Sequence, residues 1–517
     1  MSNAVQLSIM SLFNPESLIL LAVSTLAGII IGALPGLTAT MGVSLLVSTT
    51  LGLGPANALV VMVGVFLGGI YGGSRSAILL NVPGTPSSAA TALEGFPLTK
   101  QGEGVRAGVM VTTASATGGV IGLCILMLLA HPISKAAMLI GYWEFFWLGM
   151  FGIVICGSMS AERPYKGLVS GIAGLLISCI GIDGIYGGSR FAFGVTGLKA
   201  GISLVPAMVG LFGLSEAFAS LADPESHAIA SVKNVTIGDL FGYIKESFGM
   251  LRHHLKLVIR SAVIGTVIGA IPGTGEDIAS WVAYDSARRG SKEKEKFGHG
   301  SWEGLIASET ANNACTSGVF IPMLTLGIAG DAVSAILLGG LQLHGYQTGP
   351  NFMTDNPNFI YFIGVLLLLV NIMFMLEGTL ITPVIGKVLQ IRVGIIMPIV
   401  VVLSVIGAYA ANVRKFDITV MVVFGFIGFL FKKLHISPAP MALGIILGSL
   451  VELNYRRGLM AGKYSLSLFL TRPVSAALAI LLVIFVVLPI IRDKRSKAKS
   501  KTEGAIRSGK KAYYDPG

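Results

Sequence analysis

Two nearly identical hexapeptides interrupt apolar runs of this chain. Residues 31–36 read Ile-Gly-Ala-Leu-Pro-Gly and residues 268–273 read Ile-Gly-Ala-Ile-Pro-Gly, an offset of 237 (268 minus 31). Each ends on a Pro-Gly pair, which stops a helix where a membrane span would continue. In a bilayer, an interrupted helix is tolerated only where protein or a watery cavity covers its free backbone groups. The hexapeptides therefore predict two broken membrane helices.

The composition supports a membrane protein. Hydrophobic residues make up 53% of the 517 and charged residues only 12%, with a mean hydropathy of +0.79. Each apolar run approaches the roughly 20 residues that span a bilayer, so we expect one large helical unit. The net charge of +11 lies in short loops and in a tail after Ile491. The positive-inside rule explains this placement better than a nucleic-acid partner does, and it predicts a cytoplasmic C-terminus.

A second pair of similar segments follows the first in the same order. Residues 79–85 (Leu-Leu-Asn-Val-Pro-Gly-Thr) correspond to residues 325–331 (Thr-Leu-Gly-Ile-Ala-Gly-Asp), with Gly84 matched to Gly330 at an offset of 246 (330 minus 84). Two pairs at similar offsets indicate an internal repeat of about 240 residues, each copy with two breaks.

The predicted fold class is an all-α polytopic membrane protein with broken helices and re-entrant hairpins. An odd number of crossings in each repeat would make the two copies inverted. The predicted organisation is a first membrane repeat over 1–222, a polar connector over 223–256 with an amphipathic helix at 237–251, a second repeat with later membrane helices over 257–491, and a basic tail over 492–517.

Small and polar residues mark other segments. Residues 71–76 are predicted as a Gly/Ser-rich turn between apolar runs, and residues 94–106 as a polar loop. Ordinary membrane helices are expected at 109–130, 136–157, 167–182, 202–221, 359–385, 393–411, 418–431, 439–451 and 474–491.

The breaks predict a site for a small anion. Free N–H groups and the positive dipole at a helix N-terminus favour a carboxylate, whereas free carbonyls at a C-terminus suit a cation. The alternative is that the small residues only allow close helix packing. The candidate binding residues are Pro35, Gly36, Thr38, Arg75, Asn81, Pro83, Gly84, Thr85, Gly273, Thr274, Gly275, Asn312, Asn313 and Gly330.

Charged candidates have two interpretations each. Arg75 would be expensive deep in a membrane, so it is either the counter-charge of a substrate carboxylate or a surface charge that sets topology. Glu276 and Asp277, with Asn313, could bind a coupling cation, or the two acids could simply favour a helix start. The sequence has no HExxH motif and no P-loop lysine motif, so neither an enzyme, a bound cofactor nor internal ATP hydrolysis is expected.

Taken together, the motifs resemble the large membrane subunit of the tripartite tricarboxylate transporters, the TctA family. Two departures stand out: Ala329 replaces an expected proline, which could soften the break there, and Thr348 replaces another proline. The matching strings are Gly32-Ala-Leu-Pro-Gly-Leu37, Tyr71-Gly-Gly-Ser74, Asn81-Val-Pro-Gly84, Gly95-Phe-Pro97, Pro272-Gly-Thr-Gly275, Phe297-Gly-His-Gly300, Glu303-Gly304, Glu309-Thr-Ala-Asn-Asn-Ala314 and Pro322-Met-Leu-Thr-Leu-Gly327.

The resemblance implies secondary active import of a small carboxylate, driven by a Na+ or H+ gradient. It also implies a periplasmic solute-binding protein that delivers substrate, a small membrane subunit, inverted repeats that move in an elevator-like way, and a bacterial inner membrane as the location. A gradient-independent anion channel and a membrane assembly protein are the alternative functions. Whether the chain forms a homodimer stays open.

Overall fold

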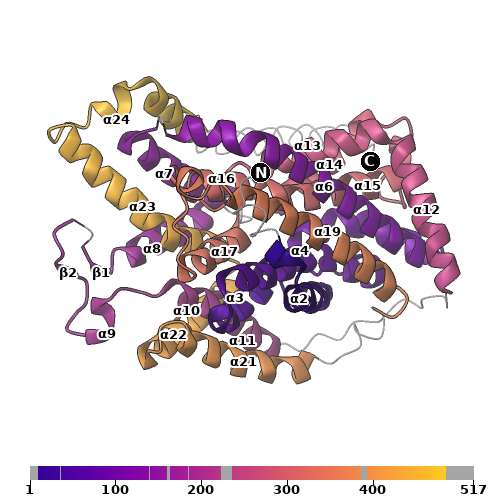
Figure 1. Cartoon of the computed structure of the whole chain (residues 1–517), viewed down its shortest axis with the longest axis horizontal. Coiled ribbons are helices and arrows are strands. Elements are labelled where there is room, and N and C mark those ends of the chain that lie inside the picture. Colours follow the sequence, from indigo (N-terminus) through magenta and orange to yellow (C-terminus); the bar gives the residue numbers. More distant parts are fainter. Residues whose placement is uncertain are drawn as a thin grey trace, which may run out of the picture.

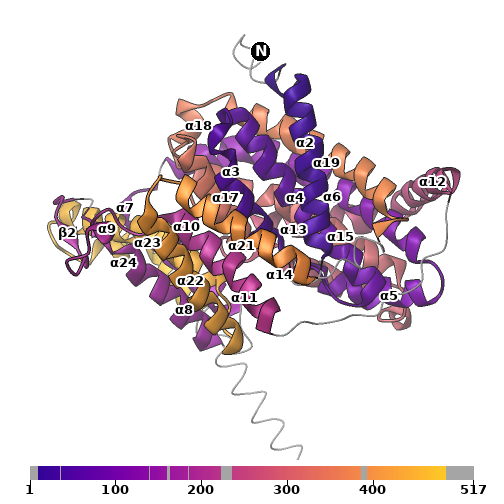
Figure 2. The same ribbon diagram turned by 90° about the horizontal axis from the view of Figure 1, so that it is seen from below.

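The computed structural model describes residues 10–34, 37–138, 140–159, 164–183, 185–222, 236–385 and 393–484. In these ranges nearly every element is a helix, and the helices pack into one broad body (Figures 1 and 2). The only strands described are β1 (Gly181–Ile182) and β2 (Ser189–Arg190), which form a two-residue antiparallel ladder. The predicted helical class is confirmed. Pro35, Gly36 and the predicted tail over 492–517 lie outside the described residues.

The first part of the chain contains two interrupted helices. Pro15 and Pro55 begin α2 and α4, where a proline costs no helical hydrogen bond. The elements are η1 (Ser11–Phe13), α2 (Pro15–Ala33), α3 (Ala39–Thr49), η2 (Thr50–Gly52), α4 (Pro55–Leu80), η3 (Pro86–Ser88), α5 (Ala89–Lys100), α6 (Gly104–Ala137), α7 (Tyr142–Met159), α8 (Pro164–Ser178), α9 (Thr196–Lys199), α10 (Leu204–Met208), the π-helical η4 (Val209–Leu214) and α11 (Ser215–Ala222).

The second part repeats the interrupted pattern. The predicted amphipathic helix is present as α12, whose Leu240 packs against Val105 and Val109 of α6. The elements are α12 (Ile237–His253), α13 (Leu255–Gly269), α14 (Gly275–Gly290), η5 (Lys294–Lys296), α15 (Trp302–Gly318), α16 (Phe320–Thr325), α17 (Ala332–Leu343), α18 (Phe352–Asp355), α19 (Phe359–Ile381), α21 (Val393–Ala410), α22 (Lys415–Lys433), α23 (Ala439–Ala461) and α24 (Leu468–Thr471).

Four of the described helices are long and apolar enough to cross a membrane: α2, α4, α6 and α19. Several shorter apolar helices accompany them, including residues 39–52, 332–343 and 473–484. Helix α4 is the most enclosed of the four, with 89% of its apolar window buried. It therefore forms the centre of the helical body, as its position in Figure 1 shows.

All four predicted breaks are present. They lie between Ala33 and Ala39, between Leu80 and Pro86, between Gly269 and Gly275, and between Thr325 and Ala332, and we call them the first to fourth breaks. The fourth break persists although Ala329 replaces the expected proline, because Gly327, just after the end of α16, adopts a φ of 69° that does not continue a helix. The missing proline therefore does not remove the break.

Glycine contacts repeat with both sequence offsets. A Cβ on Gly32 of α2 would lie 2.0 Å from the carbonyl oxygen of Gly69 on α4. A Cβ on Gly269 of α13 would lie 2.5 Å from the carbonyl oxygen of Cys315 on α15. The first helix of each pair is offset by 237 (269 minus 32) and the second by 246 (315 minus 69). The packing contacts therefore recur at the offsets of the predicted repeat, and the repeat and its boundaries stay predictions.

The same packing places the breaks of each pair side by side. A Cβ on Gly84 would lie 2.1 Å from the carbonyl oxygen of Gly32, and one on Gly330 would lie 2.8 Å from that of Gly269. In the second pair, the Gly273 N–H also donates to the Gly330 carbonyl at 2.7 Å. Each second break therefore rests on the end of the preceding broken helix.

Two loop predictions are wrong. Residues 71–76 are helical within α4, because glycines such as Gly72 let the helix approach the Ile29 carbonyl of α2. Residues 94–106 form most of α5 and the start of α6. Glu94, which made that segment look solvent-exposed, is buried and accepts hydrogen bonds from the Tyr284 hydroxyl and from three backbone N–H groups, including that of Ser301 at 2.7 Å.

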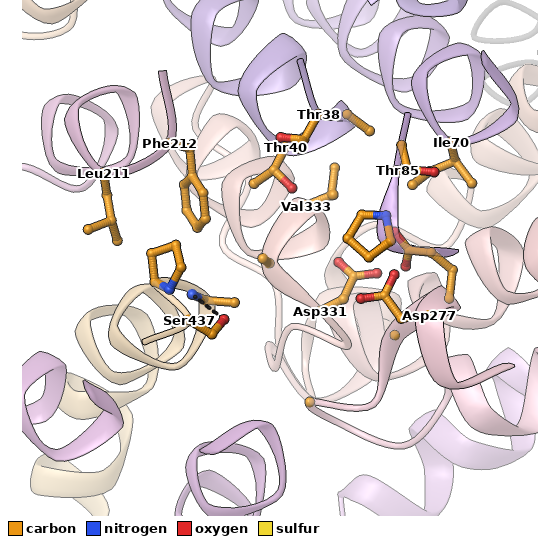
Figure 3. A pocket seen from close by; sticks show the side chains of 18 of the residues that line it. Thr38, Thr40, Ile70, Thr85, Leu211, Phe212, Asp277, Asp331, Val333 and Ser437 are labelled. Atoms are coloured by element: carbon orange, nitrogen blue, oxygen red, sulfur yellow. Dashed lines mark hydrogen bonds between the residues drawn. The ribbon is translucent and has the colours of Figure 1, made fainter. Parts of the chain in front are cut away.

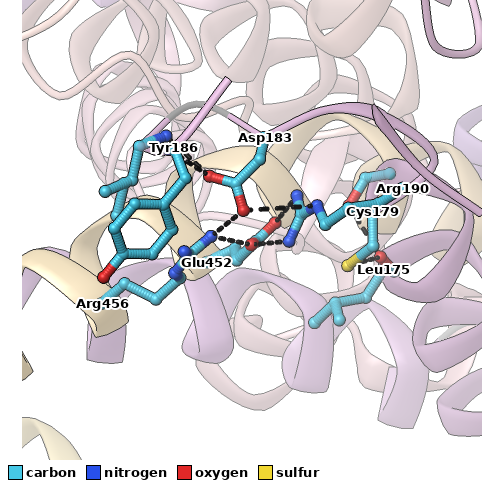
Figure 4. A network of polar contacts seen from close by, with 9 residues as sticks. Leu175, Cys179, Asp183, Tyr186, Arg190, Glu452 and Arg456 are labelled. Atoms are coloured by element: carbon cyan, nitrogen blue, oxygen red, sulfur yellow. Dashed lines mark hydrogen bonds and ion pairs between the residues drawn. The ribbon is translucent and has the colours of Figure 1, made fainter. Parts of the chain in front are cut away.

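A polar network ties the hairpin of β1 and β2 to α23 (Figure 4). Arg190 pairs with Asp183 and Glu452, and Arg456 pairs with the same two acids. The Tyr186 N–H, the Arg456 guanidinium and another backbone N–H hold the pKa of Asp183 well below its usual range. These ion pairs therefore hold the hairpin against α23, where few apolar contacts are described.

We predict that Gly32→Ala destabilises the protein. The added Cβ would meet backbone, which cannot rotate away, so α2 and α4 must separate at a cost of about 1–3 kcal/mol. Thermal unfolding in detergent measures the effect. The matched control is Gly242→Ala on α12, where a Cβ meets nothing within 4 Å. Equal melting temperatures for the two variants would contradict the packing argument.

Candidate functional site

The four breaks open into one cavity of about 680 Å³ (Figure 3). Its volume lies in the range typical of small-molecule sites. One side is formed by the segments that follow the breaks, and the other by residues of η4, α11, α22 and the start of α23. The lining on the side of the breaks is Thr38, Ala39, Thr40, Ile70, Thr85, Pro86, Gly273, Thr274, Gly275, Glu276, Asp277, Ile278, Asp331, Ala332 and Val333.

Every break presents a helix N-terminus to the cavity. The first residues of α3, η3, α14 and α17 are Ala39, Pro86, Gly275 and Ala332, and all four line it. N-termini carry unpaired N–H groups and a partial positive charge. This settles the polarity of the broken helices that the sequence left open. The breaks turn helix N-termini, rather than carbonyl ends, toward the cavity, although η3 begins with Pro86, which has no N–H.

The N-terminus of α14 has no side-chain cap, unlike the N-termini of α3 and α17. Its capping residue, Thr274, makes no side-chain hydrogen bond to the first turn. The Thr274 hydroxyl instead donates backwards to the carbonyls of Ile268 and Ile271, at 2.5 and 2.8 Å. Positive φ angles at Gly273 (83°) and Gly275 (68°) make this tight turn. The cap therefore leaves N–H groups of the first turn of α14 available to an anion, apart from the backbone N–H of Glu276, which donates to its own carboxylate.

Three carboxylates lie among these N-termini. Asp331 caps α17, where one of its oxygens accepts from the Ser334 N–H at 2.6 Å. Its other oxygen and the Oε2 atom of Glu276 are buried without a hydrogen-bond partner. Figure 3 shows Asp331 and Asp277 side by side on the side of the breaks. Within the described ranges, no group of three or more His, Cys, Asp or Glu is arranged to hold a metal ion.

The opposite side is largely apolar with one ion pair. Leu211 and Phe212 come from the π-helical η4, a distortion often found at functional sites. Glu216 of α11 pairs with Lys432 from the last turn of α22. Figure 3 shows Leu211, Phe212 and Ser437 facing the breaks across the cavity.

The structure brings together about half of the predicted site. Thr38, Thr85, Gly273, Thr274 and Gly275 line the cavity, as do the proposed cation ligands Glu276 and Asp277. Gly84 and Gly330 serve instead in the packing of the breaks, which was the alternative interpretation. The predicted residues that do not line the cavity are Arg75, Asn81, Pro83, Gly84, Asn312, Asn313 and Gly330.

Three charged residues of the cavity were missed. Asp331 had a signal in the sequence, because it follows Thr85, another lining residue, at the offset of 246 (331 minus 85). Glu216 and Lys432 had none. They lie in ordinary apolar helices, and only the tertiary structure brings them to the cavity.

Arg75 belongs to a separate buried network. Only 1% of its surface is exposed, which excludes the interpretation as a surface charge. Its guanidinium donates to the Gly108 carbonyl at 3.0 Å and to the hydroxyls of Thr112 and Thr382, at 2.6 and 3.0 Å. Its ring contact is Tyr71, 4.6 Å away. None of these partners lines the cavity.

Glu309 of α15 supplies the charge that compensates Arg75. The carboxylate is fully buried and accepts from the hydroxyls of Ser74 (2.6 Å), Ser115 (2.8 Å) and Thr91, and it interacts electrostatically with Arg75. One turn along α15, the side-chain amide of Asn312 and the Oδ1 atom of Asn313 are buried without hydrogen-bond partners. The hydrogen bonds of Glu309 join α4, α5, α6 and α15, and none of these residues lines the cavity.

Broken membrane helices around a cavity of ligand size are the architecture of a membrane transporter. The sequence comparisons agree. Residues 18–443 match the Tripartite tricarboxylate transporter TctA family, so the chain belongs to this family and the resemblance noted from its motifs is confirmed. It is a multi-pass membrane protein and a component of a tricarboxylate transporter, not an enzyme.

Two curated proteins of Agrobacterium vitis are similar to the chain. The uncharacterized 52.8 kDa protein in the TAR-I ttuC' 3'region is 34% identical over 490 residues, which cover 94% of this chain and 96% of that protein. The uncharacterized protein in the TAR-II ttuC' 3'region is 34% identical over 239 residues, which cover 45% of this chain and 98% of that protein. No solved structure matches the chain.

We predict that Arg75→Gln lowers stability, because it leaves the Glu309 carboxylate buried without its compensating charge, at a cost of about 3–5 kcal/mol. The double variant Arg75→Gln/Glu309→Gln should recover part of the loss. Thermal unfolding of the two single variants and the double variant measures the coupling. A stable Arg75→Gln protein with selectively weakened carboxylate binding would instead support the counter-charge interpretation.

Proposed function

We propose that this chain is the translocating subunit of a secondary active importer for a small di- or tricarboxylate. The convergence of four helix N-termini on one cavity carries this proposal. Backbone N–H groups and helix dipoles stabilise a carboxylate without a full positive charge nearby. The family assignment supports the tricarboxylate class.

A cation gradient is the proposed source of energy. The described lining carries four acids, Glu216, Glu276, Asp277 and Asp331, but only one basic residue, Lys432. An anion entering such a cavity meets like charges, and each repulsion is costly where water is excluded. A proton or Na+ bound at Glu276 and Asp277 would remove part of that repulsion, so substrate and cation would bind together. Asn313, the third proposed ligand, would contribute only after a movement of α15.

The remaining parts of the proposal follow from the resemblance. A periplasmic solute-binding protein would deliver the substrate, and a small membrane subunit would complete the assembly in the bacterial inner membrane. The two repeats would be inverted and would carry the cavity across the membrane in an elevator-like movement. The partition of the cavity into a side of breaks and an opposite side suits such a movement, because the two sides come from different helices.

Uptake into proteoliposomes tests the proposal. The full chain, reconstituted with its small membrane subunit and binding protein, should accumulate labelled citrate or succinate only under an inward Na+ or proton gradient. Uptake that survives collapse of both gradients would refute secondary active transport. Unsaturable currents in a voltage-clamped bilayer would favour the channel alternative.

We predict that Gly273→Val abolishes this uptake while the protein still assembles. A β-branched residue cannot readily adopt the φ of 83° at this turn, so the N-terminus of α14 would be displaced from the cavity. The matched control is Gly345→Val, since Gly345 has a φ of 85° and open space around it but does not line the cavity. Size-exclusion chromatography checks assembly. Equal uptake by both variants would contradict the role of this break.

A further inference from the structure

Lys432 is the only lysine or arginine among the described residues that line the cavity. It lies in the last turn of α22 and pairs with Glu216 in the first turn of α11. Both side chains are partly covered, with 34% and 13% of their surfaces exposed. The position of Lys432 also suits its charge, because a cation is favoured at a helix C-terminus, whereas Glu216 lies inside the continuous helical stretch 204–222. The pair is therefore stable while the cavity holds no substrate.

The pair stands across the cavity from the donors of the breaks. The N-termini of α3, η3, α14 and α17 form one side, whereas Glu216 and Lys432 belong to the other. A substrate with a single carboxylate satisfies only the donors of the breaks. A substrate with two or three carboxylates can place one on the breaks and direct another toward the opposite side. There, Lys432 is the cation available to it.

We infer that Lys432 selects di- and tricarboxylates over monocarboxylates by binding a second carboxylate of the substrate, which displaces Glu216. This inference rests on the proposed function. The exchange replaces one carboxylate partner of Lys432 with another, so the ammonium group is compensated in both states. Glu216 competes with the substrate for Lys432, so a substrate carboxylate must bind Lys432 more strongly than Glu216 does. Substrates without a second carboxylate leave the Glu216–Lys432 pair intact.

Substitutions of Lys432 and of Glu216 should therefore change the affinity for citrate in opposite directions. With purified full-length protein and citrate, succinate and acetate as probes, Lys432→Gln should raise the Kd for citrate and succinate roughly tenfold or more, the effect of losing one charge-assisted hydrogen bond. The change for acetate should be much smaller. Lys432→Arg should restore most of the citrate affinity. Glu216→Gln should lower the Kd for citrate several-fold, because the competitor has lost its charge.

Lys433→Gln is the matched control. Lys433 is the next residue of the same helix end, but its ammonium group lies over the Phe429 ring and it does not line the cavity. The same loss of charge should leave the Kd for all three probes unchanged. A citrate effect equal to that of Lys432→Gln would mean that general surface charge, rather than the pair, sets affinity.

The outcomes separate the inference from the proposed function. If the wild-type protein binds none of the three acids, the proposed substrate class fails and the inference fails with it. If wild type binds citrate and Lys432→Gln keeps the same ratio of citrate to acetate affinity, the inference alone is overturned. Should Lys432→Gln not fold, Glu216→Gln decides: tighter citrate binding supports the inference, and unchanged or weaker binding overturns it.

Discussion

The close contact of glycine-rich helices is the interaction on which the rest of this structure depends. Two helix backbones meet closely where Gly32 contacts Gly69, and two others where Gly269 contacts Cys315. A Cβ atom on Gly32 or Gly269 would lie 2.0 or 2.5 Å from a carbonyl oxygen of the other helix. In a membrane, where lipid is as apolar as leucine, such close packing replaces the hydrophobic effect as the main attraction between helices. It also holds the broken ends in place, because Gly84 and Gly330 rest on the carbonyls of the same pairs.

Once the breaks are held together, the electrostatics of the cavity follow. Helix N-termini attract an anion, while the acids among them oppose it unless cations or protons accompany it. Buried charge elsewhere is treated differently. Arg75 and Glu309 are both buried, each has its own hydrogen-bond partners, the two interact electrostatically, and neither lines the cavity. The chain thus separates the structural Arg75–Glu309 charges, in which only the Arg75 Nε atom lacks a hydrogen-bond partner, from cavity carboxylates that keep unpartnered oxygens.

The wrong loop predictions share one cause. Residues 71–76 and 94–106 look like loops because glycine and charged residues usually break helices or face water. Here both segments find partners far along the chain: Ser74 donates to Glu309, 235 positions away, and the Gly298 N–H donates to Glu94, 204 positions away. A local pattern cannot reveal such partners. The pentapeptide Tyr-Gly-Gly-Ser-Arg makes the point directly, because it is helical at 71–75 and forms part of a hairpin at 186–190.

The sequence by itself determined the membrane class and the places of the helix breaks. These depend on local chemistry, since apolar length sets a span and proline with glycine stops a helix wherever it lies. Only the tertiary structure decided which residues share the cavity. Glu216 and Lys432 reach it from helices whose sequences carry no mark of a site, and Arg75 is turned away from it by partners on three other helices. Side-chain partnership between distant segments depends on how the helices pack, and that packing is a property of the whole chain.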